Sequence, residues 1–170
     1  MKNLFKVALV AVFMLATAGF AKAQTKIGYI DFNGVIEAMP DLKPIQTQLQ
    51  TYQKTFIDQS QSMQAEFQKK GEAYEKGRQS MTDAARTAAE SELQDMQKRI
   101  QDYNRNAEQQ VQAKSSELFK PLSDKVKTAI NAVAKEKGYT YVLDSTTTGL
   151  IVSPPGDDLM AAVKVKLGIK

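Results

Sequence analysis

LKPIQTQLQTYQKTF, residues 42–56, repeats an apolar side chain at alternating steps of three and four residues. The apolar positions are Leu42, Ile45, Leu49, Tyr52 and Phe56. This spacing aligns the side chains along one side of an α-helix and is typical of a helix that packs lengthwise against another helix. The pattern continues more weakly through Met63 and Phe67 to Tyr74, with one extra four-residue step that would locally unwind a supercoil.

The same spacing returns further along the chain, after a break. The second set of apolar positions is Leu93, Met96, Ile100, Tyr103 and Ala107, followed by Val111, Leu118 and Leu122. Residues 77–82 are the best place for a turn, because Gly77 lowers helix stability by about 1 kcal/mol and Ser80 or Thr82 can cap the next helix. Two long amphipathic helices joined by a short break predict an antiparallel hairpin. We interpret the aligned apolar side chains as the core of this hairpin in preference to a ligand site.

The two ends of the chain carry a different pattern. Three short segments are rich in β-branched and aromatic side chains and predict strands: residues 26–32, 139–144 and 150–152. Pro154 and Pro155 would end the third strand. A final short helix is expected over residues 159–167.

Three further helix caps are expected from side chains and their positions. Asn33 would cap a short helix that stops before Pro40, and Asp41 would cap the first long helix. Asp157 or Asp158 would cap the last helix. Adjacent carboxylates at this point could also be imagined as a cation site, but at a helix start they are more often caps.

The predicted fold class is therefore mainly α, within α+β. A long antiparallel helical hairpin (a coiled-coil tentacle), residues 41–120, projects from a small β-containing oligomerisation body formed by residues 24–40 and 121–170. Pro121 lies inside the second helical pattern near this boundary and predicts an arm hinge, because proline removes a backbone hydrogen bond. A body of roughly 65 residues is marginal alone, so the body is expected to oligomerise.

The first 23 residues have the order of a secretory signal peptide. Lys2 and Lys6 give a basic start, VALVAVFMLATA (residues 7–18) is an apolar run, and Ala21-Lys22-Ala23 is a cleavage motif. A buried core helix would have no reason to end in this motif, and the run is too short for a permanent membrane anchor. We expect cleavage between Ala23 and Gln24 and an exported, soluble protein without stable membrane anchoring.

The net charge of +4 belongs largely to this leader. Loss of Lys2, Lys6 and Lys22 leaves 20 basic and 19 acidic residues, a net charge of +1. Residues 41–119 hold 11 basic residues, 12 acidic residues and 15 glutamines, so the arms cannot provide a strong uniform field. This near neutrality argues against nucleic acid or lipopolysaccharide as the main partner.

The sequence lacks the residues on which most catalytic sites depend. It contains no histidine and no cysteine, and it has neither a phosphate-binding Gly-rich loop ending in Lys nor a nucleophile-elbow motif. The expectation is a protein that is not an enzyme and that needs no cofactor or metal. Without cysteine it has no disulfides, so packing or assembly must stabilise it.

Two segments resemble the Skp/OmpH family of periplasmic chaperones. They are KIGYIDFNGVIEAMP, residues 26–40, and LFKPLSDKVKTAINAVAKEKGYTYVLD, residues 118–144. With the Gln- and Lys-rich double helix between them, the resemblance covers nearly the whole chain after the leader. The near-neutral arms depart from the strongly basic character of well-known members.

The resemblance implies a homotrimer whose tentacles surround a cavity and hold unfolded outer-membrane proteins without ATP. Carried over residue by residue, it places the assembly core at Ile27, Tyr29, Ile30, Tyr141, Val142, Leu143, Leu150, Ile151 and Val152. It also places Pro121 near the root of the tentacle.

Three hypotheses for function follow. The leading one is an ATP-independent periplasmic holdase chaperone that prevents aggregation of unfolded outer-membrane proteins in transit. The second is a structural coiled-coil or adaptor protein of the cell envelope with one fixed partner, which the lack of an anchor mildly disfavours. The third is a binder of nucleic acid or lipopolysaccharide, which the near-neutral charge disfavours.

Overall fold

The structure is a computed structural model that describes residues 25–169. These residues form β1 (Ile27–Ile30), α2 (Phe32–Glu37), α3 (Leu42–Gly77), α4 (Asp83–Lys137), β2 (Tyr141–Asp144), the short 3-10 helix η1 (Pro155–Asp157) and α5 (Met160–Leu167). This mainly α fold with a small sheet confirms the predicted fold class. The expected signal segment, residues 1–23, and its cleavage site at Ala23 and Gln24 lie outside the described residues.

The chain divides into two compact units. The hairpin unit is residues 33–128 and contains α3 and most of α4, and the body unit joins the segment that ends at Phe32 to Ala129–Gly168. The body unit therefore contains the sheet, η1 and α5. The sequence analysis divides the chain into a projecting arm, residues 41–120, and a body that oligomerises. These roles stay a prediction.

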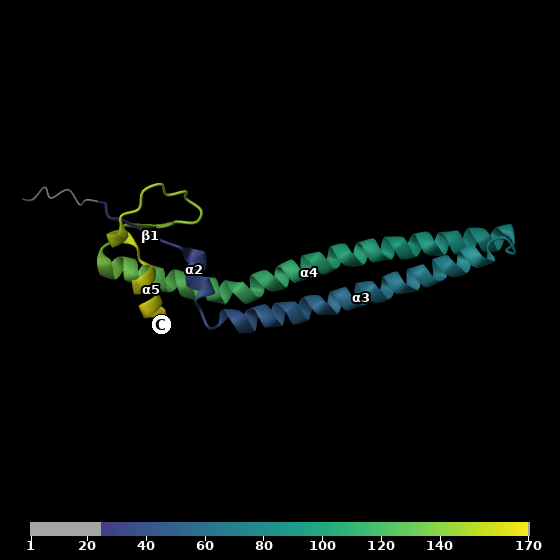
Figure 1. Ribbon diagram of the computed structural model, residues 1–170, viewed down its shortest axis with the longest axis horizontal. Helices are drawn as coiled ribbons and strands as arrows, with labels where there is room; N and C mark the ends of the chain where they lie inside the picture. The colour runs from purple at the N-terminus through teal and green to yellow at the C-terminus, as the bar shows by residue number, and fades with distance from the viewer. Residues whose placement is uncertain (1–24, 170) are drawn as a thin grey trace, which may run out of the picture. The chain divides into compact units, whose positions relative to one another are not determined.

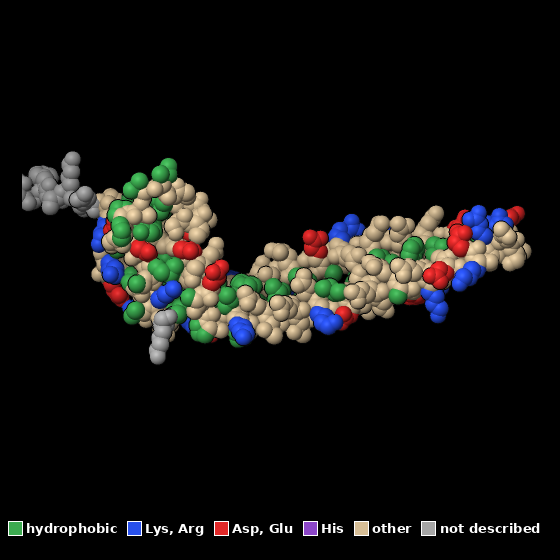
Figure 2. All heavy atoms as spheres, viewed as in Figure 1, with side chains coloured by type: hydrophobic (Ala, Val, Ile, Leu, Met, Phe, Trp, Pro, Cys, Tyr) green, Lys and Arg blue, Asp and Glu red, His purple; other side chains and the backbone are tan. Residues whose placement is uncertain are grey.

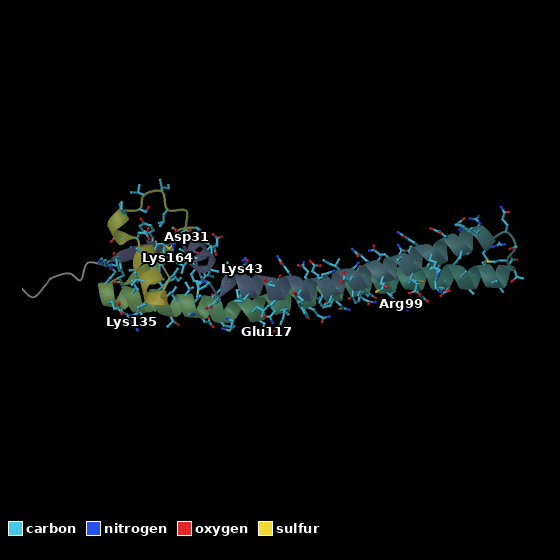
Figure 3. All side chains as sticks on the ribbon, turned by 60° about the horizontal axis from the view of Figure 1, so that its bottom comes forward. Asp31, Lys43, Arg99, Glu117, Lys135 and Lys164 are labelled. Carbon is cyan, nitrogen blue, oxygen red and sulfur yellow. The ribbon has the colours of Figure 1, made fainter. Side chains whose placement is uncertain are left out.

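In the hairpin unit, α3 and the first part of α4 lie side by side and run antiparallel (Figure 1). The half-buried residues of α3 follow the predicted apolar line from Leu42 to Tyr74 and continue to Gly77. Side chains on the outer side of α4, such as Arg99 and Glu117, are exposed and point away from α3 (Figure 3). These observations confirm the helical hairpin. With 36 residues, α3 is about 54 Å long at 1.5 Å per residue.

The turn of the hairpin lies where the sequence predicts it. The helix α3 ends at Gly77 and α4 begins at Asp83. The Thr82 hydroxyl oxygen accepts a hydrogen bond from the backbone N–H of Ala85 at 3.3 Å. The Ser80 hydroxyl instead donates to the carbonyl oxygen of Gly77 at 2.8 Å. Of the two expected caps, Thr82 is therefore the residue that caps α4.

Two other capping predictions are wrong. The helix α2 already begins at Phe32, so Asn33 is inside the helix and not before it. Asp41 stands at the N-cap position of α3 but makes no side-chain capping bond. Its carboxylate instead accepts a hydrogen bond from Lys125 Nζ at 2.9 Å. Lys125 follows Asp41 by 84 residues, so a local pattern could not reveal this competing partner.

In the body unit, β1 and β2 pair in parallel. The register joins Ile27 to Tyr141 and Ile30 to Asp144. The pairing is parallel because the chain leaves the sheet after β1 and returns to the same end only after α4, as a crossover connection requires. Both predicted strands are confirmed but are shorter than expected.

The third predicted strand, Leu150–Val152, is wrong. Residues 150–152 lie in a loop, and Ile151 and Val152 are 98% and 82% exposed. Instead, Asp158 forms an isolated parallel bridge with Tyr29, and the Leu159 N–H donates to the Tyr29 carbonyl oxygen at 3.0 Å. The free edge of β1 is therefore occupied by a segment that the apolar pattern did not indicate.

The core of the body unit is small and fully enclosed. Leu159 and Val163 have no exposed surface, and Ile30 and Val133 are also buried. A Cβ atom at Gly28 would lie 2.4 Å from Leu159 Cδ1, so only glycine lets β1 approach this closely. The N-cap position of α5 is Leu159, which makes no side-chain capping bond. The carboxylate of the residue before it, Asp158, accepts a hydrogen bond from the Met160 N–H at 2.8 Å. Neither expected residue, Asp157 or Asp158, therefore occupies the N-cap position of α5.

Candidate functional site

The structure spreads the nine predicted assembly residues over β1, β2 and the loop after β2. Ile27 and Tyr141 face each other in the sheet register and are about half exposed, and Ile151 and Val152 are the most exposed apolar side chains of the loop. Four residues are half-buried: Tyr29, Val142, Leu143 and Leu150. Ile30 is buried in the core of its own body unit. We call the four exposed members, the sheet pair Ile27 and Tyr141 and the loop residues Ile151 and Val152, the apolar edge, and its role in assembly stays a prediction.

The loop that carries Ile151 and Val152 begins with an ordered turn. The Asp144 carboxylate accepts hydrogen bonds from the Thr146 N–H at 3.0 Å and the Thr146 hydroxyl at 2.8 Å. Partial desolvation raises the pKa of Asp144, but these hydrogen bonds outweigh it and the net pKa is lowered. Asp144 therefore stays ionised at neutral pH and fixes the start of the loop.

The C-terminal segment of the body unit is held by Tyr139. Its hydroxyl donates to Asp157 Oδ1 at 3.0 Å, and Lys26 Nζ lies 4.0 Å from the centre of its ring. Desolvation and the hydrogen bond to Asp157 together raise the pKa of Tyr139. Asp157 thus serves as a hydrogen-bond acceptor that ties this segment to Tyr139.

Polar contacts join the two helices of the hairpin toward its turn. Lys70 pairs with Glu92, and the Tyr74 hydroxyl donates to Glu90. The hydrogen bond to Glu90 raises the pKa of Tyr74. Figure 2 shows side chains of both charge signs near the turn and an interrupted line of hydrophobic side chains along the hairpin. The hairpin surface is therefore mixed in charge, as its composition predicts.

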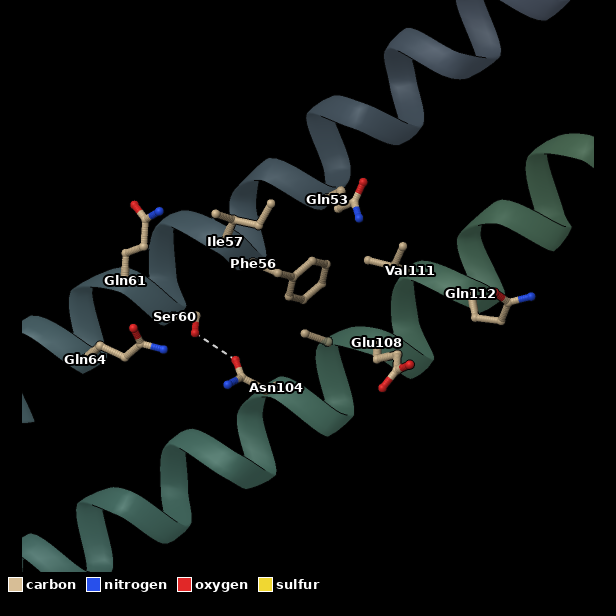
Figure 4. Close-up of a pocket in the computed structure, with 11 residues that line it drawn as sticks. Gln53, Phe56, Ile57, Ser60, Gln61, Gln64, Asn104, Glu108, Val111 and Gln112 are labelled. Carbon is tan, nitrogen blue, oxygen red and sulfur yellow. Dashed lines mark hydrogen bonds between the residues drawn. The ribbon is translucent and has the colours of Figure 1, made fainter.

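Midway along the hairpin, a groove of about 510 Å³ opens between α3 and α4 (Figure 4). Its apolar side chains are Phe56, Ile57, Ala107 and Val111. Its polar side chains are Gln53, Ser60, Gln61, Gln64, Asn104, Glu108 and Gln112. We call this site the mid-hairpin groove. The arrangement can bind a partner by apolar contact and by amide hydrogen bonds.

Phe56, which lines the mid-hairpin groove, belongs to an aromatic cluster. The rings of Tyr52 and Phe56 meet edge to face with centroids 5.1 Å apart, and Phe56 lies 6.2 Å from the ring of Tyr103. One turn further along α3, the Ser60 hydroxyl donates to Asn104 Oδ1 of α4 at 2.8 Å. Phe56 is thus held in place from both helices, and the groove is preformed.

Sequence reasoning did not identify the mid-hairpin groove. The spacing of the inner positions does contain a signal for the groove. On the first helix, two four-residue steps follow each other, from Tyr52 to Phe56 and to Ser60. On the second helix, two four-residue steps lead from Tyr103 to Ala107 and to Val111. Each helix departs from the alternating pattern, but only the structure shows that both departures occur at the same level.

Within residues 25–169, no helix is both long and apolar enough to cross a membrane. The same range contains no group of three or more acidic side chains placed to hold a metal ion. Pro121 is exposed within α4, which is assigned as one helix through it, and its role as a hinge stays a prediction.

A long helical hairpin joined to a small two-stranded sheet defines one class of protein fold. Comparison with known families identifies the family that has this fold. Residues 26–167 match the family described as "Outer membrane protein (OmpH-like)", so the chain belongs to this family. The resemblance to Skp/OmpH proteins is thereby confirmed, and it supports a chaperone role.

Individual relatives span almost the same length. Outer membrane protein 26 of Haemophilus influenzae is 26% identical over 193 residues, covering 96% of this chain and 93% of the relative. The chaperone protein Skp of Vibrio cholerae is 28% identical over 153 residues, covering 86% and 89%. A crystal structure of a putative outer membrane chaperone (OmpH-like) from Caulobacter crescentus has the same fold, with a TM-score of 0.68, 14% identity and coverage of 84% and 83%.

Proposed function

We propose that this protein is an ATP-independent periplasmic holdase that binds unfolded outer-membrane proteins and keeps them from aggregating in transit. Membership of the OmpH-like family supports this role, and the Vibrio cholerae relative is named as a chaperone. The observation that carries the proposal is the depth of packing in the hairpin. The helix α3 has no fully buried residue, so its apolar line remains partly accessible along its whole length.

A partly accessible apolar line suits a protein that holds many different chains. Each contact with a client is weak, because part of the surface of each apolar side chain is already buried against the other helix. Several weak contacts from several arms add up by avidity, without any one fixing the client. No catalytic step or nucleotide is needed for such binding, so we propose that the protein is not an enzyme.

The arms would be brought together by the body. We propose a homotrimer assembled through the apolar edge, with Ile27, Tyr141, Ile151 and Val152 as its most exposed members. A sheet of two strands supports this, since β2 has one edge without a partner among the described residues. Tyr29, Ile30, Val142, Leu143 and Leu150 would support this edge from within the body.

The test is suppression of aggregation. An outer-membrane β-barrel protein unfolded in urea is diluted with and without the purified protein, and light scattering is followed in the absence of nucleotide. We expect scattering to be suppressed at near-stoichiometric protein, and an inert globular protein to have no such effect. Full aggregation in the presence of the folded protein would contradict the proposal and favour a structural coiled-coil protein of the cell envelope.

Export is tested separately. We propose that residues 1–23 are removed during passage to the periplasm. The intact mass of the exported protein should then correspond to a chain that begins at Gln24. A mass that retains the leader would contradict a freely diffusing periplasmic holdase.

A further inference from the structure

The mid-hairpin groove is a local exception to the packing of the hairpin. From Leu42 to Phe67 the line of α3 otherwise carries bulky side chains, but at this level the inner positions are Ser60 and Ala107. Two small residues leave the edge of Phe56 uncovered. The next residue, Ile57, is 48% exposed at the rim, although a core position would enclose it. The groove therefore presents apolar surface on a hairpin that stays folded.

The rim of the groove is almost uncharged. Four exposed glutamines surround it: Gln53, Gln61, Gln64 and Gln112. Within residues 25–169, their side-chain amides make no hydrogen bond to protein groups. Each amide offers two N–H donors and one acceptor oxygen. Glu108 is the one ionisable residue among those that line the groove. The rim can thus pair with polar groups of either kind but gives little to a charged side chain.

The length of the groove fits an extended chain. From Gln53 to Gln64 the groove follows α3 for about 16 Å, at 1.5 Å per helical residue. An extended segment rises about 3.3 Å per residue, so about five residues cover this distance, with every second side chain facing the floor. Two or three apolar side chains can therefore meet Phe56, Ile57 and Val111 at once.

We propose that the mid-hairpin groove docks an extended, uncharged segment of unfolded polypeptide in which apolar and polar residues alternate. This rests on the proposed holdase function and names its binding element. The strands of outer-membrane barrels have this alternation over about ten residues. Their apolar side chains would lie on the floor, and their unpaired backbone N–H and C=O groups would meet the glutamine amides. A charged side chain in the groove would lose water without gaining a partner.

A second copy of the hairpin fits the groove less well. The backbone groups of a helix are already hydrogen-bonded internally, so a docked helix could not use the free amides of the rim. An unfolded segment has every backbone group available. The chemistry of the rim therefore favours an extended client over an arm-to-arm contact.

The test compares three variants of the full chain in binding to dye-labelled ten-residue peptides. One peptide alternates Val, Phe and Tyr with Thr, Ser and Gln; a second keeps the apolar residues but carries Asp at the polar positions. Ala107→Leu fills the groove, Ile57→Gln removes its exposed wall, and Ala113→Leu adds the same bulk at an exposed site of α4 outside the groove. Fluorescence anisotropy gives the dissociation constants.

We expect Ala107→Leu to weaken binding of the uncharged peptide about tenfold and Ile57→Gln about threefold, because each change reduces the apolar surface that the peptide can bury. Ala113→Leu should stay within about twofold of the parent, and the Asp-containing peptide should bind at least about tenfold more weakly. Circular dichroism checks that each variant keeps its helical content. If the Ala107→Leu variant has a lower helical content than the parent, the test depends on Ile57→Gln. Ile57 is half exposed, so its substitution should leave the fold intact.

Equal binding by Ala107→Leu and Ala113→Leu would overturn the groove proposal. So would a change in oligomeric state on sedimentation with unchanged peptide binding, since the groove would then be a contact between copies. Suppression of β-barrel aggregation by the parent protein is measured alongside. If it persists while the groove variants change nothing, the docking site is wrong and the holdase function stands.

Discussion

The long helix α3 and the core of the body unit bury their apolar side chains to different depths. Over its 36 residues, α3 has no fully buried residue, whereas Leu159 and Val163 in the body unit have no exposed surface. Packing along α3 is thus spread thinly, while packing in the body is concentrated in a few side chains; the fully buried Val35 and Val126 of the hairpin unit lie outside α3. A thinly packed surface can contact a client without unfolding. A concentrated core holds the strands in place, and its own side chains are enclosed and out of reach of a client.

The largest expected effect breaks the concentrated core. Leu159→Ala should destabilise the protein by about 4 kcal/mol, because a fully buried leucine leaves a cavity. Leu49→Ala, at a half-buried position of α3, is the matched control and should cost about 1 kcal/mol. Denaturant unfolding followed by circular dichroism measures both. Equal losses would show that the two units do not differ in packing.

The next comparison makes one substitution in both units with opposite expected signs. Gly28→Ala should destabilise the body by about 2 kcal/mol, because the new Cβ would lie 2.4 Å from Leu159 Cδ1. Gly71→Ala should stabilise the hairpin by about 1 kcal/mol, because a Cβ there would meet no atom within 4 Å beyond the neighbouring helix backbone and alanine favours a helix interior. Thermal unfolding of the two variants decides this. A stable Gly28→Ala protein would mean that Leu159 can move aside.

The same contrast explains what could be predicted from sequence. The hairpin was predictable because its determinants are local: steps of three and four residues, a glycine at the turn and Thr82 as a cap. The strand expected at Leu150–Val152 was not, because strand formation depends on a partner. Backbone groups of Asp158 and Leu159 take the free edge of β1, and this is a tertiary competition that apolar runs do not record.

The candidate site shows the same limit. The four-residue steps around Phe56 and Ala107 are each visible in the sequence, but a groove forms only when both lie at one level of the hairpin. The hydrogen bond between Ser60 and Asn104 crosses 44 residues of sequence. Such an alignment depends on the length of the turn and the register of the helices, and neither is encoded in one helix alone.

A smaller effect is expected at the proline of α4. Pro121→Ala restores a backbone N–H inside the helix and should stabilise α4 by about 1 kcal/mol, since the helix penalty of proline is partly offset in the unfolded chain. If Pro121 is a hinge, the variant should also narrow the spread of the arms in small-angle X-ray scattering. An unchanged spread would mean that the proline is tolerated without serving as a hinge.

The smallest expected effect is that of salt on client holding. Charges of both signs are interspersed along the hairpin, and many are paired within one helix, as Lys54 with Asp58 and Lys114 with Glu117. Such pairs leave no extended field to be screened, and screening acts mainly on charges separated by more than about 10 Å at 0.1 M salt. Raising salt from about 0.05 to 0.5 M should therefore weaken the binding of an unfolded β-barrel protein by less than about threefold.

The control for this measurement is a variant whose hairpin carries a positive electrostatic field. Gln53→Lys, Gln61→Lys and Gln64→Lys together place three positive charges on the rim of the mid-hairpin groove. This variant should bind an acidic peptide in a strongly salt-dependent way, which shows that the assay detects charge when charge is present. If the parent protein loses client binding as steeply as this variant, local charge patches carry the holding. The half-exposed apolar line of α3 would then serve the hairpin alone, and the difference in packing between the two units would have no bearing on function.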